Sequence, residues 1–179
     1  MIDIDHFKEI NDRFGHAAGD RLLRQFAGIL RASVREDDVV LRFGGEEFLV
    51  VLKKTVLDYP EICAEKVRAA VENAEFDLGE GAAVRRTCSV GYTNFPFYPE
   101  APDRASFDQA LRIADLGLYQ AKKGGRNRTV GISPLSPNAS VEETDVLFAD
   151  LDTAVEKGLV RVRPGRKPEQ PPDARKAGP

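Results

Sequence analysis

The hydrophobic positions of this chain switch repeatedly between the alternating pattern of strands and the helical pattern of roughly 3.6 residues per turn. Residues 1–4 read as the end of a buried strand, and residues 5–14 follow at helical spacing. A second helix is predicted through about Val34, with Asp20 suited to its N-cap. The apolar faces of these helices consist of Phe7, Ile10 and Phe14 in the first and Leu22, Leu23, Phe26, Ile29 and Leu30 in the second.

Two short β-rich runs, 39–43 and 48–52, enclose the sequence Gly44-Gly45-Glu46-Glu47. Because glycine tolerates the positive φ angles of a tight turn, this stretch predicts a β-hairpin. The other elements expected before residue 132 are helices at 59–71 and 106–123 and strands at 84–95 and 128–131. Their inward-facing residues are Ile62, Cys63, Val67 and Val71 in the first of these helices and Phe107, Leu111, Ala114 and Leu118 in the second.

The resulting order, β-α-α-β-β-α-β-α-β, places a hairpin among helical crossovers. Since hairpins pair antiparallel strands and crossovers produce parallel neighbours, the predicted fold class is α/β with a mixed central sheet flanked by helices. After residue 131 the composition changes. Residues 132–140 are expected to be a linker, 141–160 one acidic helix, and 161–179 a disordered tail rich in Pro, Lys and Arg.

The composition of the 179-residue chain, with 42% hydrophobic residues, fits one globular domain with some excess chain. No apolar run approaches the roughly 20 residues that span a bilayer, so we expect a cytoplasmic protein without a membrane partner. Cys63 and Cys88 are isolated and are predicted to be reduced thiols that fill the core. The net charge is −3, and the basic tail leaves the rest of the chain more acidic, which disfavours a nucleic-acid partner.

Carboxylates gather at two places in the predicted sheet. Asp3 and Asp5 end the first strand on one face, and Glu46 and Glu47 lie at the turn of the hairpin. Acids at the end of a central strand, beside two more on a hairpin, form a suitable site for Mg²⁺, which prefers oxygen ligands. Taken alone, the hairpin is equally compatible with an ordinary turn that carries solvated acids.

Two further pairs of residues suit a nucleotide. Asp20 offers an acceptor for guanine N1 and N2, and Asn11 complements O6 and N7, a pattern that would reject adenine. Lys122 and Arg126, at the end of the last predicted helix, suit the oxygens of a triphosphate. In isolation, helix capping explains the first pair as well, and the helix dipole explains the second.

In this order, the stretches DIDHFKEINDRFGHAAGD, RFGGEEF and ADLGLYQAKKGGRN strongly resemble the GGDEF family of diguanylate cyclases over residues 1–131, with the active GGEEF variant of the signature. The resemblance implies a palm-like nucleotidyl cyclase fold, a homodimer of catalytic domains, two Mg²⁺ or Mn²⁺ ions per site, and condensation of two GTP into cyclic di-GMP. It implies catalytic roles for Asp3, Glu46 and Glu47 and metal ligation by Asp3, Ile4, Glu46 and Glu47. The implied GTP-binding residues are His6, Phe7, Asn11, Asp20, Gly44, Gly45, Lys122 and Arg126.

The sequence Arg35-Glu-Asp-Asp38 reads RxxD and lies shortly before Gly44, where the family places its product-inhibition site. The resemblance therefore implies that Arg35 and Asp38 bind cyclic di-GMP. A secondary basic contact is expected near Lys66 or Arg68. On its own, an RxxD sequence is also compatible with a surface ion pair.

Members of the family normally begin with a further helix and a longer first strand, which this sequence lacks. A misplaced start or a fragment is the preferred explanation, and a short natural protein is the alternative. We therefore weigh an active cyclase against a catalytically impaired regulatory domain that binds GTP or cyclic di-GMP. The intact acids favour the enzyme, whereas the missing segment favours the binding domain. A cyclase with a mononucleotide product is disfavoured by the hairpin and the RxxD sequence.

Overall fold

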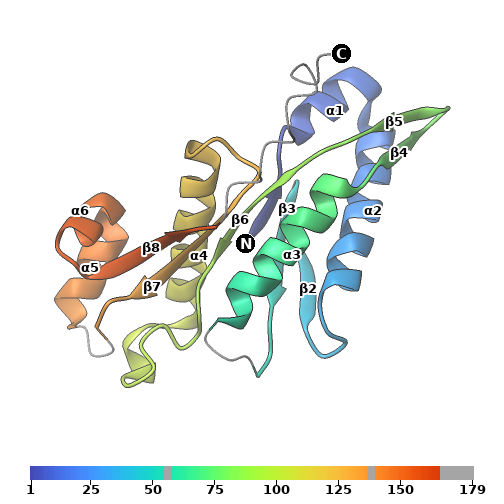
Figure 1. The fold of residues 1–179 in the computed structure, drawn as a ribbon. Coiled ribbons are helices and arrows are strands. Elements are labelled where there is room, and N and C mark those ends of the chain that lie inside the picture. Colours follow the sequence, from blue (N-terminus) through green and yellow to red (C-terminus); the bar gives the residue numbers. More distant parts are fainter. Residues whose placement is uncertain (55–57, 137–139, 166–179) are drawn as a thin grey trace, which may run out of the picture.

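The computed structural model describes residues 1–54, 58–136 and 140–165. Its main sheet has the strand order β2-β3-β1-β6-β7-β8 (Figure 1). The strands of this sheet are β1 (Ile2–Ile4), β2 (Val39–Gly44), β3 (Glu47–Val51), β6 (Cys88–Tyr92), β7 (Thr129–Pro134) and β8 (Val160–Pro164). Strands β6 and β7 pair in parallel, whereas the other neighbouring strands described are antiparallel. The predicted α/β fold with a mixed central sheet is confirmed.

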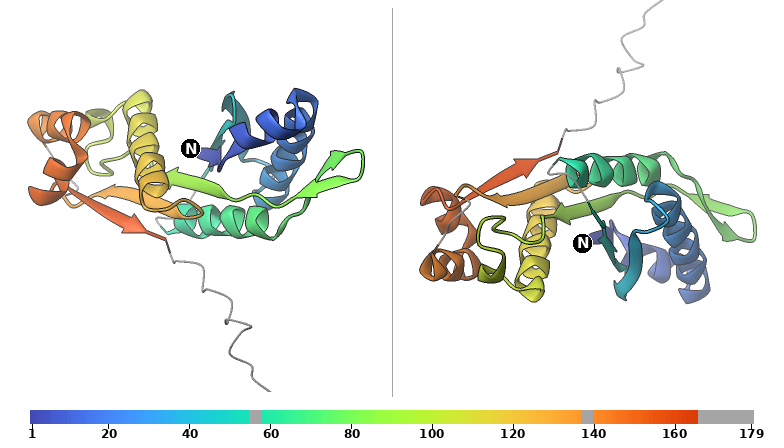
Figure 2. Two further views of the ribbon diagram at one scale, coloured as in Figure 1. Left: turned by 90° about the horizontal axis from the view of Figure 1, so that it is seen from above. Right: turned by 90° about the horizontal axis from the view of Figure 1, so that it is seen from below.

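Helices cover both faces of this sheet. They are α1 (Phe7–Phe14), α2 (His16–Ser33), α3 (Tyr59–Asn73), α4 (Phe107–Lys123), α5 (Val141–Ala149) and α6 (Leu151–Glu156), with a short 3₁₀ helix, η1 (Pro102–Arg104). In Figure 2, α4 lies on the face of β6 opposite to α3. The central strand β1 is therefore enclosed on both sides, which requires apolar residues on both faces.

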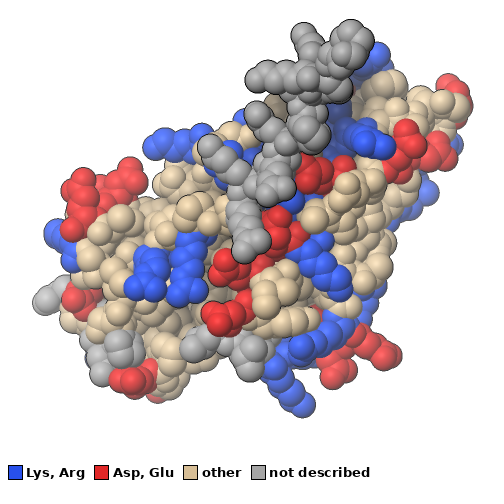
Figure 3. Space-filling model, in the orientation of Figure 1, with Lys and Arg blue, Asp and Glu red and all other residues tan. Residues whose placement is uncertain are grey.

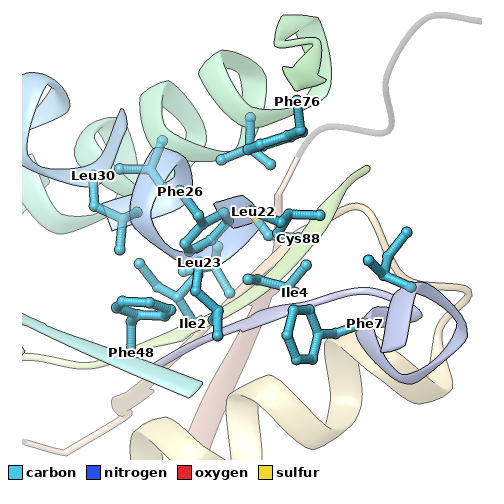
Figure 4. Packing of buried hydrophobic residues seen from close by; sticks show 14 of the residues in the cluster. Ile2, Ile4, Phe7, Leu22, Leu23, Phe26, Leu30, Phe48, Phe76 and Cys88 are labelled. Atoms are coloured by element: carbon cyan, nitrogen blue, oxygen red, sulfur yellow. The ribbon is translucent and has the colours of Figure 1, made fainter. Parts of the chain in front are cut away.

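The alternation of side chains along β1 decides which helix each residue meets. Ile2 and Ile4 are buried in the cluster that α2 and α3 cover, where the ring of Phe26 packs at a tilt against Phe48 of β3, with 5.1 Å between the ring centroids (Figure 4). Met1 packs on the other face in a cluster with Leu49, Ala114 and Leu118. Since side chains alternate along a strand, Asp3 points to the same face as Met1, toward α4.

The helix boundaries correct one prediction. Asp20 is not the N-cap of the second helix, because α2 begins at His16 with Gly15 as its N-cap. Gly15 has a φ of 80°, a conformation that glycine adopts without cost, so the chain turns and restarts a helix at once. Asp20 instead lies on an exposed part of the second turn of α2.

Two residues predicted to face inward are exposed. Ile62 is 63% exposed, because the buried stripe of α3 runs through Cys63, Val67 and Val71 and Ile62 lies beside it. Phe107 is 43% exposed and packs edge-on against the exposed Phe95 at 5.5 Å instead. Cys63 and Cys88 are free and buried, as predicted.

The strand predicted at 84–95 is present but shorter, as β6, and an additional hairpin precedes it. A separate hairpin of β4 (Phe76–Gly79) and β5 (Ala82–Val84) comes first, and β6 follows at Cys88. The hairpin turns at Gly79, Glu80 and Gly81, which all have positive φ angles. The tripeptide Gly-Glu-Gly is the signal in the sequence that predicts this turn.

The region after residue 131 is more ordered than predicted. Strand β7 continues to Pro134, inside the expected linker, and the expected single helix is divided into α5 and α6 at Asp150, whose carboxylate caps α6. Strand β8 begins at Val160, within the expected helix, runs into the expected disordered tail and pairs antiparallel with β7. These elements bury a second core that contains Phe97, Tyr98, Ala105, Ile113, Ile132, Leu147, Leu151, Ala154 and Val160. Residues 137–139 of the predicted linker and 166–179 of the predicted tail lie outside the described residues.

Charged side chains are mixed over the molecular face shown in Figure 3, where Lys and Arg lie beside Asp and Glu in the part that is described. This visible face therefore has no broad area of a single charge. Among the described helices, none is both long enough and apolar enough to cross a membrane.

Candidate active site

The site predicted from the sequence is built around Asp3 at the centre of the sheet. In the ladders of β1, Asp3 lies opposite Glu47 of β3 on one side and Ser89 of β6 on the other. The amide of the next residue, Ile4, donates a hydrogen bond of 3.4 Å to the carbonyl of Glu46. The fold therefore brings Asp3 and Ile4 next to both glutamates of the hairpin.

Asp3 is 5% exposed and carries its charge in a nearly closed environment. Burial raises the pKa of this carboxyl group, and the charges of Glu46 and Glu47 raise it further, while Lys122 acts in the opposite direction. The Nζ atom of Lys122, in the last turn of α4, lies 2.7 Å from Oδ2 of Asp3. The ion pair thus joins the end of α4 to the centre of the sheet.

The hairpin leaves open space beside these acids. Its ladder shifts register between Arg42 and Gly44, and Gly45 has a φ of 41°. Arg42 donates from Nε and Nη2 to the carbonyl of Gly45 at 3.0 and 2.8 Å, which fixes the turn. A Cβ atom added to Gly44 or Gly45 would meet nothing within 4 Å, so the two glycines border free space.

The donor set at this place suits a hard divalent cation. Within the described residues, no group of three or more His, Cys, Asp or Glu side chains is already arranged to hold a metal ion. The carboxylates of Asp3, Glu46 and Glu47 are nevertheless close enough to influence one another electrostatically, and the ammonium group of Lys122 already supplies a positive charge at Asp3. Carboxylate and carbonyl oxygens of this kind fit Mg²⁺ or Mn²⁺.

The first turn of α1 presents backbone amides near β1 that no side chain caps. His6 precedes this helix with a φ of 59° and provides no side-chain cap, because its ring contacts Glu9 at 2.9 Å instead. The amide groups at the start of the helix, beginning at Phe7, therefore donate no hydrogen bond to a capping side chain. Uncapped amides at a helix N-terminus attract anions such as phosphate.

The two candidate base-reading residues lie close together. A Cβ atom at Gly19 would lie 2.0 Å from Oδ1 of Asn11, so the Asn11 side chain rests directly against α2, beside Asp20. Asp20 borders a surface hollow between α2 and the hairpin, which is also lined by Leu23, Arg24, Ala27, Val40, Arg42 and Phe48. The hollow is bounded by an acid, two arginines and apolar side chains, which suits a nucleobase.

The loop after α4 presents the second candidate phosphate ligand. Arg126 is exposed, and its amide donates to the carbonyl of Ala121 at 3.0 Å. Gly125, Arg126 and Asn127 have φ angles of 110°, 61° and 46°. The loop thus turns back toward β1 through three consecutive residues with positive φ.

Asp5 does not belong to the cluster of acids around Asp3. It is 1% exposed, and its carboxylate accepts hydrogen bonds from Thr87 Oγ1 at 2.6 Å, Ser89 Oγ at 2.7 Å and the amide of Asn127 at 3.0 Å. With these partners Asp5 connects the end of β1 to β6 and to the loop before β7. The expectation that Asp5 joins Asp3 in a metal site is therefore wrong, because its carboxylate is held by partners that lie far away in the chain.

The RxxD residues lie on the connection between α2 and β2. The carboxylate of Asp38 is 3% exposed and accepts from the amides of Arg35 at 3.0 Å and Lys53 at 2.9 Å. The guanidinium group of Arg35 lies over the ring of Tyr59 at 4.1 Å. The Nζ atom of Lys66 donates to the carbonyl of Ser33 at 2.8 Å, at the start of the same connection.

Arg68 does not join this group. Its side chain is 5% exposed and binds Glu65, Glu72 and Asn127 at distances of 2.7 to 2.8 Å. Residues that are two positions apart in a helix are separated by roughly 200° of rotation, so Lys66 and Arg68 point to nearly opposite sides of α3. Of the two candidates for the secondary basic contact, the structure brings Lys66 to the RxxD connection.

The fold and site define a mixed α/β domain in which an acid on the central strand lies beside a Gly-Gly-Glu-Glu hairpin. A sequence model described as diguanylate cyclase, GGDEF domain, matches residues 1–128, and the chain belongs to this family. The resemblance seen in the sequence is thereby confirmed.

Curated relatives agree over the same region. The chain is 44% identical over 128 residues to diguanylate cyclase DgcP of Pseudomonas aeruginosa, covering 72% of this chain and 18% of that protein. It is 40% identical over 128 residues to diguanylate cyclase A of Treponema denticola, covering 72% of this chain and 33% of that one. The chain thus spans no more than a third of the length of these two relatives.

Solved structures show the same fold. The GGDEF domain of YfiN from Pseudomonas aeruginosa superimposes with a TM-score of 0.62 at 37% identity, covering 70% of this chain and 75% of that one. The GGDEF domain of DgcB from Caulobacter crescentus, in complex with c-di-GMP, superimposes with a TM-score of 0.61 at 28% identity, covering 70% of this chain and 71% of that one.

Proposed function

We propose that this domain is a diguanylate cyclase, which condenses two GTP molecules into cyclic di-GMP. The 3′-hydroxyl of each GTP attacks the α-phosphorus of the other, and one pyrophosphate leaves in each of the two steps. The observation that carries the proposal is the position of Asp3, buried beside both glutamates of the Gly-Gly-Glu-Glu hairpin. The names of the relatives, at 37 to 44% identity, support the same reaction.

Two divalent cations, Mg²⁺ or Mn²⁺, are proposed to bind at Asp3, Glu46, Glu47 and the carbonyl of Ile4. When bound, such ions neutralise charge that develops on phosphate oxygens. Glu47 is proposed to assist metal binding or to accept the proton of the attacking hydroxyl. The rigid ladder around Asp3 holds these oxygens in place before substrate arrives, which is the protein's own contribution.

The base and the phosphates are proposed to bind at separate ends of one site. Asp20 and Asn11 read the guanine, and Gly44 and Gly45 leave room for the nucleotide. The proposed phosphate contacts are Lys122, Arg126 and the amides at His6 and Phe7. Since one domain holds one GTP, two copies must face each other to complete the reaction. We therefore propose a homodimer as the active form.

We propose that cyclic di-GMP inhibits the domain by binding at the RxxD connection. Arg35 and Lys66 are the proposed ligand contacts, because both are cations on the same side of the α2–β2 connection. Asp38 is proposed to fix the turn through its two backbone hydrogen bonds as well as to face the product. Arg35→Ala should lower the affinity for cyclic di-GMP about tenfold or more in calorimetric titration, as expected for loss of a charge-assisted contact. Equal affinities for the two proteins would refute this site.

A second candidate function is a regulatory domain that binds GTP or cyclic di-GMP without turnover. It is favoured by the ion pair of Lys122 with Asp3, which occupies an oxygen that the cyclase needs for metal. Incubating the purified chain with GTP and Mg²⁺ and identifying the products by mass separates the two functions. Cyclic di-GMP formed by the wild type, and lost in Glu46→Gln, supports the cyclase. GTP binding without product supports the regulatory domain.

A further inference from the structure

A partly buried polar network connects α3 to the loop that carries Arg126, and Asn127 lies at its centre. The side chain of Asn127 accepts from Nη1 of Arg68 at 2.8 Å and donates from Nδ2 to Oε1 of Glu72 at 2.7 Å. Its amide donates to Oδ2 of Asp5 at 3.0 Å. One residue thus binds α3 through its side chain and the end of β1 through its backbone.

The backbone of this loop requires such anchors. Arg126 and Asn127 adopt φ angles of 61° and 46°, which residues with a Cβ atom rarely adopt. Two consecutive residues in this conformation persist only where surrounding contacts hold them. The hydrogen bonds of Asn127 to Arg68, Glu72 and Asp5 provide these contacts on both sides of the loop.

Arg68 forms the rigid base of the network. Burial acts to lower its pKa, but hydrogen bonds to Glu65 and Glu72 outweigh burial and raise it, so the side chain stays charged. The guanidinium group uses Nη2 for Glu65 at 2.7 Å and Nη1 for both Glu72 and Asn127. This branched geometry is specific to arginine, because a lysine ammonium cannot reach three separated partners in one plane.

The far side of the loop lies at the candidate active site. Asp5 follows β1 two residues after Asp3, and Lys122, which pairs with Asp3, lies four residues before Arg126. The network therefore sets the position of the loop relative to the acids of the sheet. Arg126 itself is exposed and free of this packing.

We propose that Asn127 and Arg68 are positioning residues for nucleotide binding, which hold the loop so that Arg126 faces the triphosphate. The inference rests on the proposed GTP site and assigns to the buried Arg68 and the partly buried Asn127 a role beyond stabilising the fold. It predicts that loosening the network weakens binding of the phosphates and leaves binding of the base unchanged.

The variant Asn127→Gly tests this role. Glycine adopts the same positive φ freely, so the loop can keep its path while both side-chain anchors are lost. The ion pairs of Arg68 with Glu65 and Glu72 remain in this variant. Glu65→Gln is the matched control, since Glu65 binds Arg68 but does not contact the loop.

The probes are a GTP analogue with an α,β-methylene bridge, titrated with Mg²⁺ by calorimetry, and guanosine, titrated by NMR. We expect Asn127→Gly to lower the affinity for the analogue about tenfold, the effect of losing one well-placed charged contact. The affinity for guanosine should stay within about twofold of the wild-type value. Arg68→Lys should show the same selective loss to a smaller degree. Glu65→Gln should behave like the wild type toward both probes.

The outcomes separate this inference from the proposed function. If Arg126→Ala lowers the affinity for the analogue but Asn127→Gly does not, the positioning role is wrong and the phosphate role of Arg126 stands. If Asn127→Gly weakens analogue and guanosine equally, the network is merely structural and the inference is overturned. If Arg126→Ala leaves the analogue unaffected, the proposed phosphate site fails, and the inference fails with it.

Discussion

The Nζ atom of Lys122 lies 2.7 Å from Oδ2 of Asp3, so a proposed phosphate ligand is paired with a proposed metal ligand. The pair joins the last turn of α4 to the central strand β1. Because Asp3 is nearly buried, the lysine offsets a charge that the fold otherwise leaves without compensation. A metal ion that binds Asp3, or a phosphate that binds Lys122, must therefore either accommodate this ion pair or break it.

Lys122→Met should destabilise the metal-free protein by about 1–2 kcal/mol, because the buried carboxylate of Asp3 loses its ionic partner. Mg²⁺ should restore part of the lost stability by replacing the positive charge. Thermal melts with and without Mg²⁺ measure both effects. Lys123→Met is the control, since Lys123 is exposed and lies beside Lys122 on the same helix. A similar loss in both variants would contradict the importance of the pair.

As the pH is lowered, metal binding should begin to weaken at a higher pH than the pKa of an ordinary aspartate would predict. The pKa of Asp3 is raised by burial and by Glu46 and Glu47, so the folded protein keeps this proton to higher pH than the unfolded chain. By linkage, the contribution of Asp3 to folding stability is full below the pKa of an unfolded aspartate and is lost as pH rises through the folded pKa. Mn²⁺ must displace the proton, so its affinity should fall as pH drops through that raised pKa. Mn²⁺ titration over pH tests this, and a flat affinity down to the range of a normal aspartate would contradict it.

Gly19→Ala should impair guanine recognition. The added Cβ atom would lie 2.0 Å from Oδ1 of Asn11 and would push this side chain from its place beside Asp20. We expect the preference for GTP over ATP to fall about tenfold, the effect of losing one or two hydrogen bonds to the base. Competition binding of the two nucleotides measures it. Gly28→Ala, in the same helix with nothing within 4 Å of the added atom, should keep the preference and gain about 0.5–1 kcal/mol of stability.

Leu147→Ala should destabilise the domain by about 2–5 kcal/mol, because this side chain is 1% exposed in the second core. Urea denaturation measures the loss. Val155→Ala is the comparison, since Val155 lies on the neighbouring helix α6 and is 42% exposed. If both variants lost the same small amount, the elements after β7 would contribute little to stability.

The parts of the site that the sequence predicts best are local. Each of three features is encoded by a few consecutive residues: the Gly-Gly-Glu-Glu turn, the acid in β1 and the RxxD connection. The structure then brings Asp3 to Glu47 through strand pairing, as the pattern implied. The prediction of Asp20 as an N-cap is wrong, because α2 already begins at His16, after Gly15, earlier than the apolar pattern indicates.

The unpredicted features depend on distant partners. The sequence offers Arg68 as a candidate contact for cyclic di-GMP, whereas the structure buries it against Glu65 and Glu72 of its own helix and against Asn127 of the loop before β7. Asp5 is likewise explained by Thr87 and Ser89 of another strand. The order of the described residues after 131 depends on long-range packing, because Leu147 of α5 and Val160 of β8 are buried in the second core.

Strand β8 determines what another protein meets at this border of the sheet. It covers β7 and leaves Arg161 and Arg163 on the outermost strand, which ends at Pro164. The exposed Arg161 would repel the same residue of a second copy, and Pro164 has no amide hydrogen to donate to an incoming strand. Within the described residues, this edge of the sheet therefore discourages edge-to-edge pairing with a second copy, which protects against aggregation.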